Sequence, residues 1–130
     1  MIEDDIVGII KESKGAPLNA LVDTFRRGRD VDELLQLLES EDADLVAIAA
    51  WILDELPFNL YNRDDFIVRL KRLLDHPDPR VRFNALGALF PKLEGDWVTA
   101  DALLAKLLKD PNEGVRMSAE AAARRLSQAP

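Results

Sequence analysis

The 130-residue sequence contains no cysteine and a single histidine. The absence of cysteine excludes disulfide bonds and thiolate metal ligands. The one histidine, His76, precedes Pro77 in a turn between two predicted helices, and no residues with metal-ligand spacing surround it. We interpret it as a turn residue and expect neither a metal site nor a cofactor.

Long apolar segments are also missing, since no run approaches the roughly 20 residues that a membrane-spanning helix needs. Residues 1–5 are largely acidic, whereas a secretory signal begins with basic residues and continues with an apolar segment. We therefore expect a cytoplasmic protein without membrane contact. With 48% hydrophobic and 32% charged residues, the composition is that of a globular protein, and the length suits one domain.

Catalytic motifs are absent as well. No serine stands in a nucleophile motif, and Gly87 and Gly95 are isolated rather than part of a phosphate-binding loop. The adjacent acids Asp64 and Asp65 lie near a predicted helix start, where they favour the helix dipole. We expect no catalytic residues and predict that the protein is not an enzyme.

The net charge is −7, and it is divided unevenly. Residues 1–65 contain 16 acids and 6 bases, whereas residues 66–130 contain 8 acids and 11 bases. A negative total disfavours nucleic-acid binding, which needs clustered lysine and arginine. The asymmetry can steer a basic partner toward the acidic half, although solvated helix faces explain it equally simply.

The stretch from His76 to Phe90 contains both a helix start and a repeat unit. Asp78 can accept a hydrogen bond from the first-turn amides, and Pro79 suits the first helical position. Apolar residues follow at helical spacing. A second copy begins 34 residues later, at Asp110, and a weaker copy lies 36 residues earlier, with Asp42 at the capping position of Asp78.

The preceding helices repeat with the same offsets, because Leu38, Leu74 and Leu108 each end a leucine-rich segment. Two-helix units of this length bury their apolar faces by stacking. We expect one domain: an N-terminal capping helix pair at 1–28, whose first helix carries Ile2, Ile6, Ile9 and Ile10, and repeats at 29–57, 58–93 and 94–130. Predicted helix caps are Asp30 with Glu33, Asn62, and Thr99 or Asp96.

The motif D-P-x-V-R-x-x-A at residues 78–85 resembles the second-helix signature of HEAT and HEAT-like (PBS-lyase-type) repeats. The resemblance implies an all-α fold, a right-handed α-solenoid of about four antiparallel helix pairs. It also implies that the arginine after the valine bridges to an acid of a neighbouring repeat. We therefore predict the pairs Arg82 with Asp42 and Arg116 with Asp78.

The face of each second helix opposite its core stripe is the candidate binding surface. By resemblance, this helix lines the concave side of the stack. Exposed aromatics are frequent in protein interfaces; in the alternative interpretation, tight curvature buries these side chains against one another. The predicted row is Ala47, Trp51, Asp54, Phe83, Gly87, Phe90, Met117, Ala121 and Arg124, from which we take partner-binding residues Trp51, Asp54, Phe83, Gly87, Phe90, Met117 and Arg124.

These observations predict a non-catalytic protein-protein interaction module, such as an adaptor, scaffold or inhibitor of the immunity type, that binds a protein partner through its concave face. It would act as a monomer or weak homodimer. HEAT-like relatives also include a pigment lyase and a DNA glycosylase. The alternatives are therefore a pigment-lyase-like protein and a nucleic-acid module with Trp51 or Phe83 for stacking and with Arg80, Arg82, Arg116, Arg124 and Arg125 on phosphates.

Overall fold

The structure is a computed structural model that describes residues 16–127, and this part of the chain contains helices and no strand. The elements are α2 (Ala16–Arg26), α3 (Asp32–Leu38), α4 (Ala43–Glu55), the 3-10 turn η1 (Phe58–Leu60), α5 (Asp64–Leu73), α6 (Pro79–Leu93), α7 (Trp97–Leu107) and α8 (Glu113–Ser127). The predicted first helix of the N-terminal pair lies outside the described residues.

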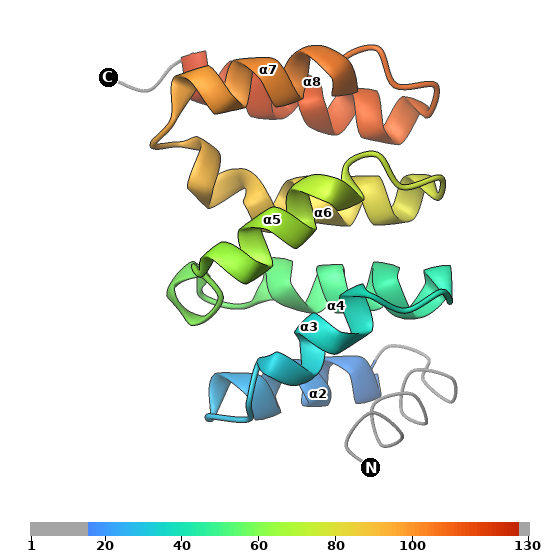
Figure 1. Ribbon diagram of the computed structural model, residues 1–130, viewed down its shortest axis with the longest axis vertical. Helices are drawn as coiled ribbons and strands as arrows, with labels where there is room; N and C mark the ends of the chain where they lie inside the picture. Colours follow the sequence, from blue (N-terminus) through green and yellow to red (C-terminus); the bar gives the residue numbers. More distant parts are fainter. Residues whose placement is uncertain (1–15, 128–130) are drawn as a thin grey trace.

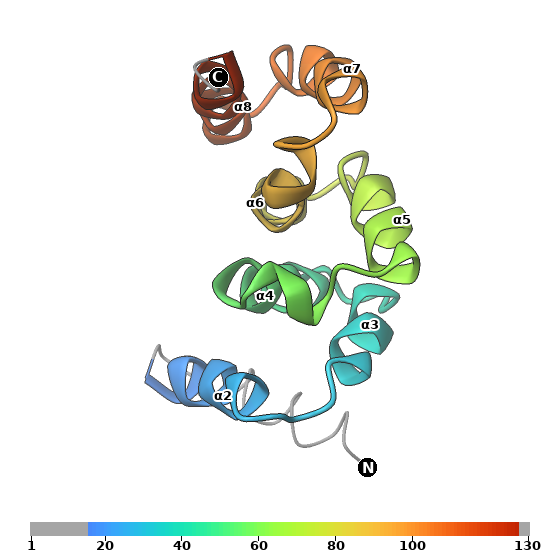
Figure 2. The same cartoon turned by 90° about the vertical axis from the view of Figure 1, so that its left-hand side faces the viewer.

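The helices form two columns (Figures 1 and 2). One column contains α3, α5 and α7, and the other contains α2, α4, α6 and α8. Each helix of the first column pairs with the next helix in the chain, and successive pairs stack along the long axis (Figure 1). Seen along the helices, the second column lies on the inner side of a shallow arc (Figure 2). The fold is an α-solenoid.

Capping residues determine where the second helices begin. The carboxylate of Asp78 accepts a hydrogen bond from the Arg80 amide at 2.8 Å, and Pro79 occupies the first turn. Asp42 caps α4 in the same way, through the Asp44 amide at 2.9 Å. At the other end of a helix, Gly28 adopts a φ of 114°, which closes α2 in a conformation that favours glycine.

First helices are capped less uniformly. The predicted cap Asp96 is confirmed for α7, because it accepts from the Thr99 amide at 3.1 Å. The predicted cap Asn62 is wrong: α5 begins after Arg63 without a side-chain cap, and the carboxylate of Asp65 instead accepts from the Phe66 amide.

The predicted capping box of α3 forms only in part. Asp30 accepts a hydrogen bond from the amide of Asp32 at 2.9 Å, so it does satisfy one first-turn donor. Glu33, however, forms an ion pair with Arg29 instead of reaching back to the capping residue. Competition from a nearby guanidinium therefore removes the second half of the motif.

The core follows the repeat positions. The second helix of each repeat has a fully buried alanine at the equivalent position, namely Ala49, Ala85 and Ala119. A small side chain at this place lets neighbouring helices approach closely. Larger apolar residues from both columns fill the remaining space and form a single continuous cluster along the stack. Burial of this cluster is the main favourable contribution to folding.

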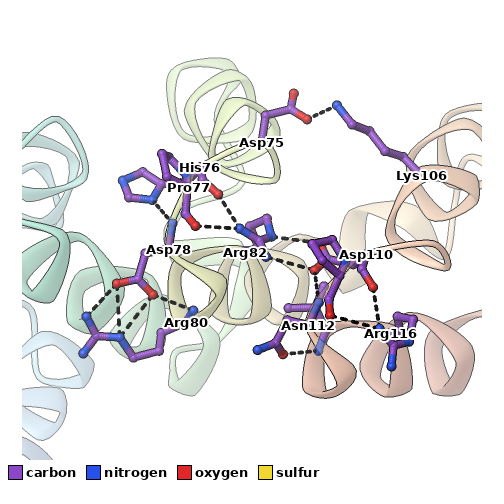
Figure 3. A network of polar contacts seen from close by, with 12 residues as sticks. Asp75, His76, Pro77, Asp78, Arg80, Arg82, Lys106, Asp110, Asn112 and Arg116 are labelled. Atoms are coloured by element: carbon purple, nitrogen blue, oxygen red, sulfur yellow. Dashed lines mark hydrogen bonds and ion pairs between the residues drawn. The ribbon is translucent and has the colours of Figure 1, made fainter.

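An ion pair between Arg82 and Asp110 joins the second and third repeats (Figure 3). Nε and Nη2 of Arg82 donate to the two carboxylate oxygens at 2.8 and 2.9 Å, while Nη1 donates to the carbonyls of His76 and Pro77. The two charged side chains are only 12% and 6% exposed. Asp110 also accepts from the Asn112 amide. The guanidinium of Arg82 therefore connects the loop before α6 with the loop before α8.

The predicted pairs Arg82 with Asp42 and Arg116 with Asp78 are wrong. Arg82 reaches forward to Asp110 because the loop before α8 stacks over the first turn of α6 (Figure 3). Asp78 is instead held by Arg80, which also bridges back to Asp44 at 2.7 Å.

Arg116 reproduces only the local half of the Arg82 arrangement. Its Nη1 donates to the carbonyls of Asp110 at 2.8 Å and Pro111 at 3.1 Å. Within residues 16–127 no acid meets the remaining guanidinium nitrogens. Arg82 and Arg116 thus form a matched pair, one with and one without a cross-repeat carboxylate.

This difference yields a stability prediction. Arg82→Ala leaves the buried carboxylate of Asp110 without its cation, so we expect the free energy of unfolding to fall by about 2–3 kcal/mol. Arg116→Ala removes the same local hydrogen bonds but strands no carboxylate, and its loss is expected to stay below about 1 kcal/mol. Urea denaturation of both variants checks the prediction; equal losses would contradict the role of the cross-repeat pair.

Low pH should reduce the stabilisation that the ion pairs of these loops provide. The Arg80 guanidinium lowers the pKa of Asp78 to about 2, and the Arg82 guanidinium holds the pKa of Asp110 below its usual value. Because both folded-state values are depressed, the stabilisation is complete above about pH 4 and is lost as the pH falls toward 2. Urea denaturation across this range should show that loss. Asp110→Asn, which cannot titrate, should give a shallower pH dependence; an unchanged slope argues against the assignment.

Candidate binding grooves on the concave face

Two hollows open on the second-helix side of the stack. The first, here named the Trp51 groove, has a volume of about 360 Å³ and lies mainly between α4 and α6. Most of its surface is apolar, and its lining residues are Leu18, Ala47, Ile48, Trp51, Pro79, Arg80, Phe83, Asn84 and Asn112.

The second hollow, named the Asp54 groove, has a volume of about 400 Å³ and is more polar. It lies toward the carboxyl ends of α4, α6 and α8. Its lining residues are Asp54, Leu86, Gly87, Phe90, Pro91, Glu94, Ser118, Ala121, Ala122 and Arg125. The Trp51 groove lies mainly between α4 and α6 and the Asp54 groove mainly between α6 and α8, so α6 contributes to both.

The Trp51 groove is lined by two aromatic side chains, and a hydrogen bond joins the two helices that form it. Asn84 Nδ2 donates to the carbonyl of Ala47 at 2.9 Å, which joins α6 to α4. Trp51 is half-buried against the core, whereas Phe83 is 47% exposed. The groove therefore combines a fixed base with aromatic surface open to solvent, an arrangement suited to an apolar side chain.

Asp54 lies directly against the backbone of α6. A Cβ atom built on Gly87 would be 2.9 Å from the Asp54 carboxylate, so only glycine leaves room for this position. No hydrogen bond or ion pair joins Asp54 to another side chain or amide of residues 16–127. Partial burial, followed by repulsion from Glu55, raises the pKa of Asp54. The groove thus contains an exposed acid that lies against Gly87 and has no cation beside it among the described residues.

Phe90 also lines the Asp54 groove. The guanidinium of Arg125 lies 4.8 Å from the centroid of its ring, a cation-π contact between α8 and α6. Beside it, Pro91 lies inside α6 and has no amide hydrogen for the carbonyl of Gly87. The proline therefore leaves the helix without one backbone donor at the groove.

The predicted binding residues fall in three places. Trp51, Asp54, Phe83, Gly87 and Phe90 line the two grooves, as does Ala121. Met117 is 59% exposed on α8 and, like the exposed Arg124, lies outside both linings. Ala47 is buried beneath Asn84. Complete burial of the aromatic row, the alternative interpretation, does not occur, because Phe83 is exposed.

The sequence reasoning missed several lining residues. Ile48 and Asn84 lie one position beyond the predicted helix face, and a wider face of about 140° would have included them. Glu94 follows the last residue of α6, where helical periodicity no longer applies. Arg125 was considered only as a phosphate ligand, and nothing in its local pattern shows that it covers Phe90.

The arginines proposed for nucleic-acid binding are mostly engaged. Arg80 pairs with Asp44 and Asp78, and Arg82 pairs with Asp110. Arg116 donates to backbone carbonyls. Among the described residues no acid pairs with Arg124 or Arg125, and both of these lie on α8.

Residues 16–127 contain no group of three or more histidine or acidic side chains placed to hold a metal ion. None of the helices described has both the length and the apolar composition needed to cross a bilayer.

Comparison with known proteins identifies the class of this α-solenoid. The family model for HEAT repeats matches residues 31–124, so the chain belongs to the HEAT repeat family. HEAT repeats generally mediate protein-protein interaction, and typically they are non-catalytic scaffolds. No curated protein matches the chain.

One solved structure, the crystal structure of an engineered protein, is similar in fold. Its TM-score is 0.61 at 23% sequence identity, and the match covers 98% of this chain. The chain spans 56% of the length of that protein. The likeness supports the helical repeat architecture described above.

Replacement of Gly87 tests the geometry of the Asp54 groove. In Gly87→Ala the new methyl group must displace the Asp54 carboxylate toward solvent, while alanine favours the helix by up to about 1 kcal/mol. We expect the free energy of unfolding to stay unchanged or rise, and the pKa of Asp54 to move toward its ordinary value. NMR titration of the carboxyl carbon measures the pKa; an unaltered value would contradict the contact.

Proposed function

We propose that this domain is a non-catalytic protein-binding module that holds a protein partner on its concave face, in the Trp51 and Asp54 grooves. Adaptors, scaffolds and inhibitors all act through a face of this kind. The observation that carries the proposal is the exposed ring of Phe83 beside Trp51, on the side of the stack that curves inward.

The shape and chemistry of this face support a protein ligand. Three consecutive second helices contribute to it, so its surface is continuous along the stack. Its centre is aromatic and its borders are polar, a distribution that is common in protein interfaces. Truncation of aromatic residues at such centres often costs about 2 kcal/mol or more of binding free energy.

The same face offers little for catalysis. Ser118 is the one hydroxyl-bearing residue that lines the Asp54 groove, and no histidine lines either hollow. His76 lies in the loop before α6, where its Nδ1 accepts a hydrogen bond from the Asp78 amide at 3.0 Å. The histidine base that most often activates a serine hydroxyl is therefore not part of this lining. This supports binding as the role of the grooves.

The test compares two substitutions of an apolar residue by aspartate, one on the concave face and one on the outer column of the solenoid. Phe83→Asp places a charge in the Trp51 groove, whereas Val68→Asp changes a residue of nearly the same exposure, 48%, on α5 in the outer column. Each purified protein is used to capture partners from an extract of the source cells. We expect the wild type and Val68→Asp to capture the same partner. The affinity of that partner for Phe83→Asp should be about 30-fold lower, which is the effect of losing an interface hot spot.

Circular dichroism must show that both variants remain folded. Equal capture by all three proteins would contradict the concave-face proposal. Recovery of nucleic acid alone, with strongly salt-dependent binding, would favour a phosphate-binding role for the arginines of α8 instead.

A further inference from the structure

We propose that the Trp51 and Asp54 grooves together bind an extended peptide segment of the partner, which carries an arginine or lysine side chain two or three residues from a bulky apolar one. The cation lies at Asp54 and the apolar side chain lies between Trp51 and Phe83. This inference rests on the proposed function and specifies its ligand.

The first observation behind it is the state of Asp54. Its carboxylate lies against Gly87 and is exposed at the groove, and it has no cationic or hydrogen-bonding partner among residues 16–127. An accessible carboxylate without a cation can form a charge-assisted hydrogen bond with a ligand. The group that complements it is a positively charged donor.

The second observation is the balance of charge in the Asp54 groove. Asp54 and Glu94 face one cation, Arg125, which is engaged with the ring of Phe90. The groove thus retains a net negative charge. The adjacent Glu55 adds to the negative potential. This complementarity selects a basic ligand over an acidic one.

The third observation is the chemistry of the groove wall. The ring of Phe90 is occupied by the guanidinium of Arg125, so the site left for a ligand cation is the carboxylate of Asp54. Beside Phe90, Pro91 cannot donate to the carbonyl of Gly87, so the wall has one backbone donor fewer than an uninterrupted helix. An arginine fork presents several donors to such a surface.

Helix geometry determines the spacing of the two ligand side chains. Trp51 and Asp54 are three residues apart on α4, about 4.5 Å along its axis, and Phe83 and Phe90 are seven residues apart on α6, about 10 Å. In an extended peptide each residue advances about 3.3 Å. Side chains two or three positions apart are therefore separated by about 7–10 Å, which lies between these two axial separations.

The apolar half of the motif follows from the Trp51 groove. Its lining is largely apolar, and its volume of about 360 Å³ can accept a leucine, methionine or aromatic side chain. Binding of this residue accounts for affinity through buried surface, while the cation at Asp54 determines the register and direction of the peptide.

A selection experiment with the purified full chain tests the motif. Random dodecapeptides displayed on phage are selected on the wild-type protein, and the enriched sequences are synthesised with a fluorescent label. We expect a basic residue two or three positions from a bulky apolar one. Fluorescence anisotropy then gives the Kd for the wild type and for each variant.

Two acids that are neighbours in the sequence provide the matched control. Asp54→Asn is expected to weaken binding about tenfold, the effect of losing one charge-assisted hydrogen bond. Glu55→Gln removes the same charge from a residue that does not line the groove, so the expected change is below about twofold. A peptide with its basic residue changed to glutamine should bind wild type and Asp54→Asn equally.

The outcomes separate the two proposals. The motif is overturned if the enriched peptides lack a basic residue, or if their Kd is unchanged by Asp54→Asn. In that case, loss of peptide binding in Phe83→Asp would still support the concave-face function. If no enriched peptide depends on Phe83, both proposals fail. If the peptides bind Glu55→Gln as weakly as they bind Asp54→Asn, the attraction comes from the total negative charge of this region and not from Asp54. That outcome would also overturn the assignment of Asp54.

Discussion

Burial of each helix pair against the next is the constraint on which the rest of the structure depends. No pair encloses its own apolar residues, so stability requires that neighbours stack closely. The buried alanines Ala49, Ala85 and Ala119 permit this approach in successive repeats. The curvature that results brings three second helices to one face, and this face holds both grooves.

Helix starts, which depend on local sequence, could be predicted in part: Asp96 caps α7, whereas Asn62 does not cap α5. Asp78 and Pro79 start α6 as their pattern indicates, and the repeat offsets identify the helix pairs. The ion pairs could not be predicted, because the same arginine can reach an acid before or after it in the stack. Arg82 pairs with Asp110 rather than Asp42, a choice made by the stacking of loops.

The candidate grooves were predictable only in part, for the same reason. Helical periodicity places Trp51, Asp54 and Phe83 on the inner face. It does not show that Gly87 admits the Asp54 carboxylate, a contact between residues of two different repeats. Neither does it show that Arg125 covers Phe90. Such details depend on how two helices meet, and a single helical pattern contains no information about its neighbour.

The position of the Arg82–Asp110 pair has a mechanical consequence. It fixes the amino end of α8 to the amino end of α6, whereas the Asp54 groove opens near the carboxyl ends of the same helices. At the carboxyl ends of these helices the guanidinium of Arg125 lies over the ring of Phe90, and core packing continues between the two ends. The third repeat is therefore held to the second by an arginine at each end of the seam, one paired with a carboxylate and the other with an aromatic ring.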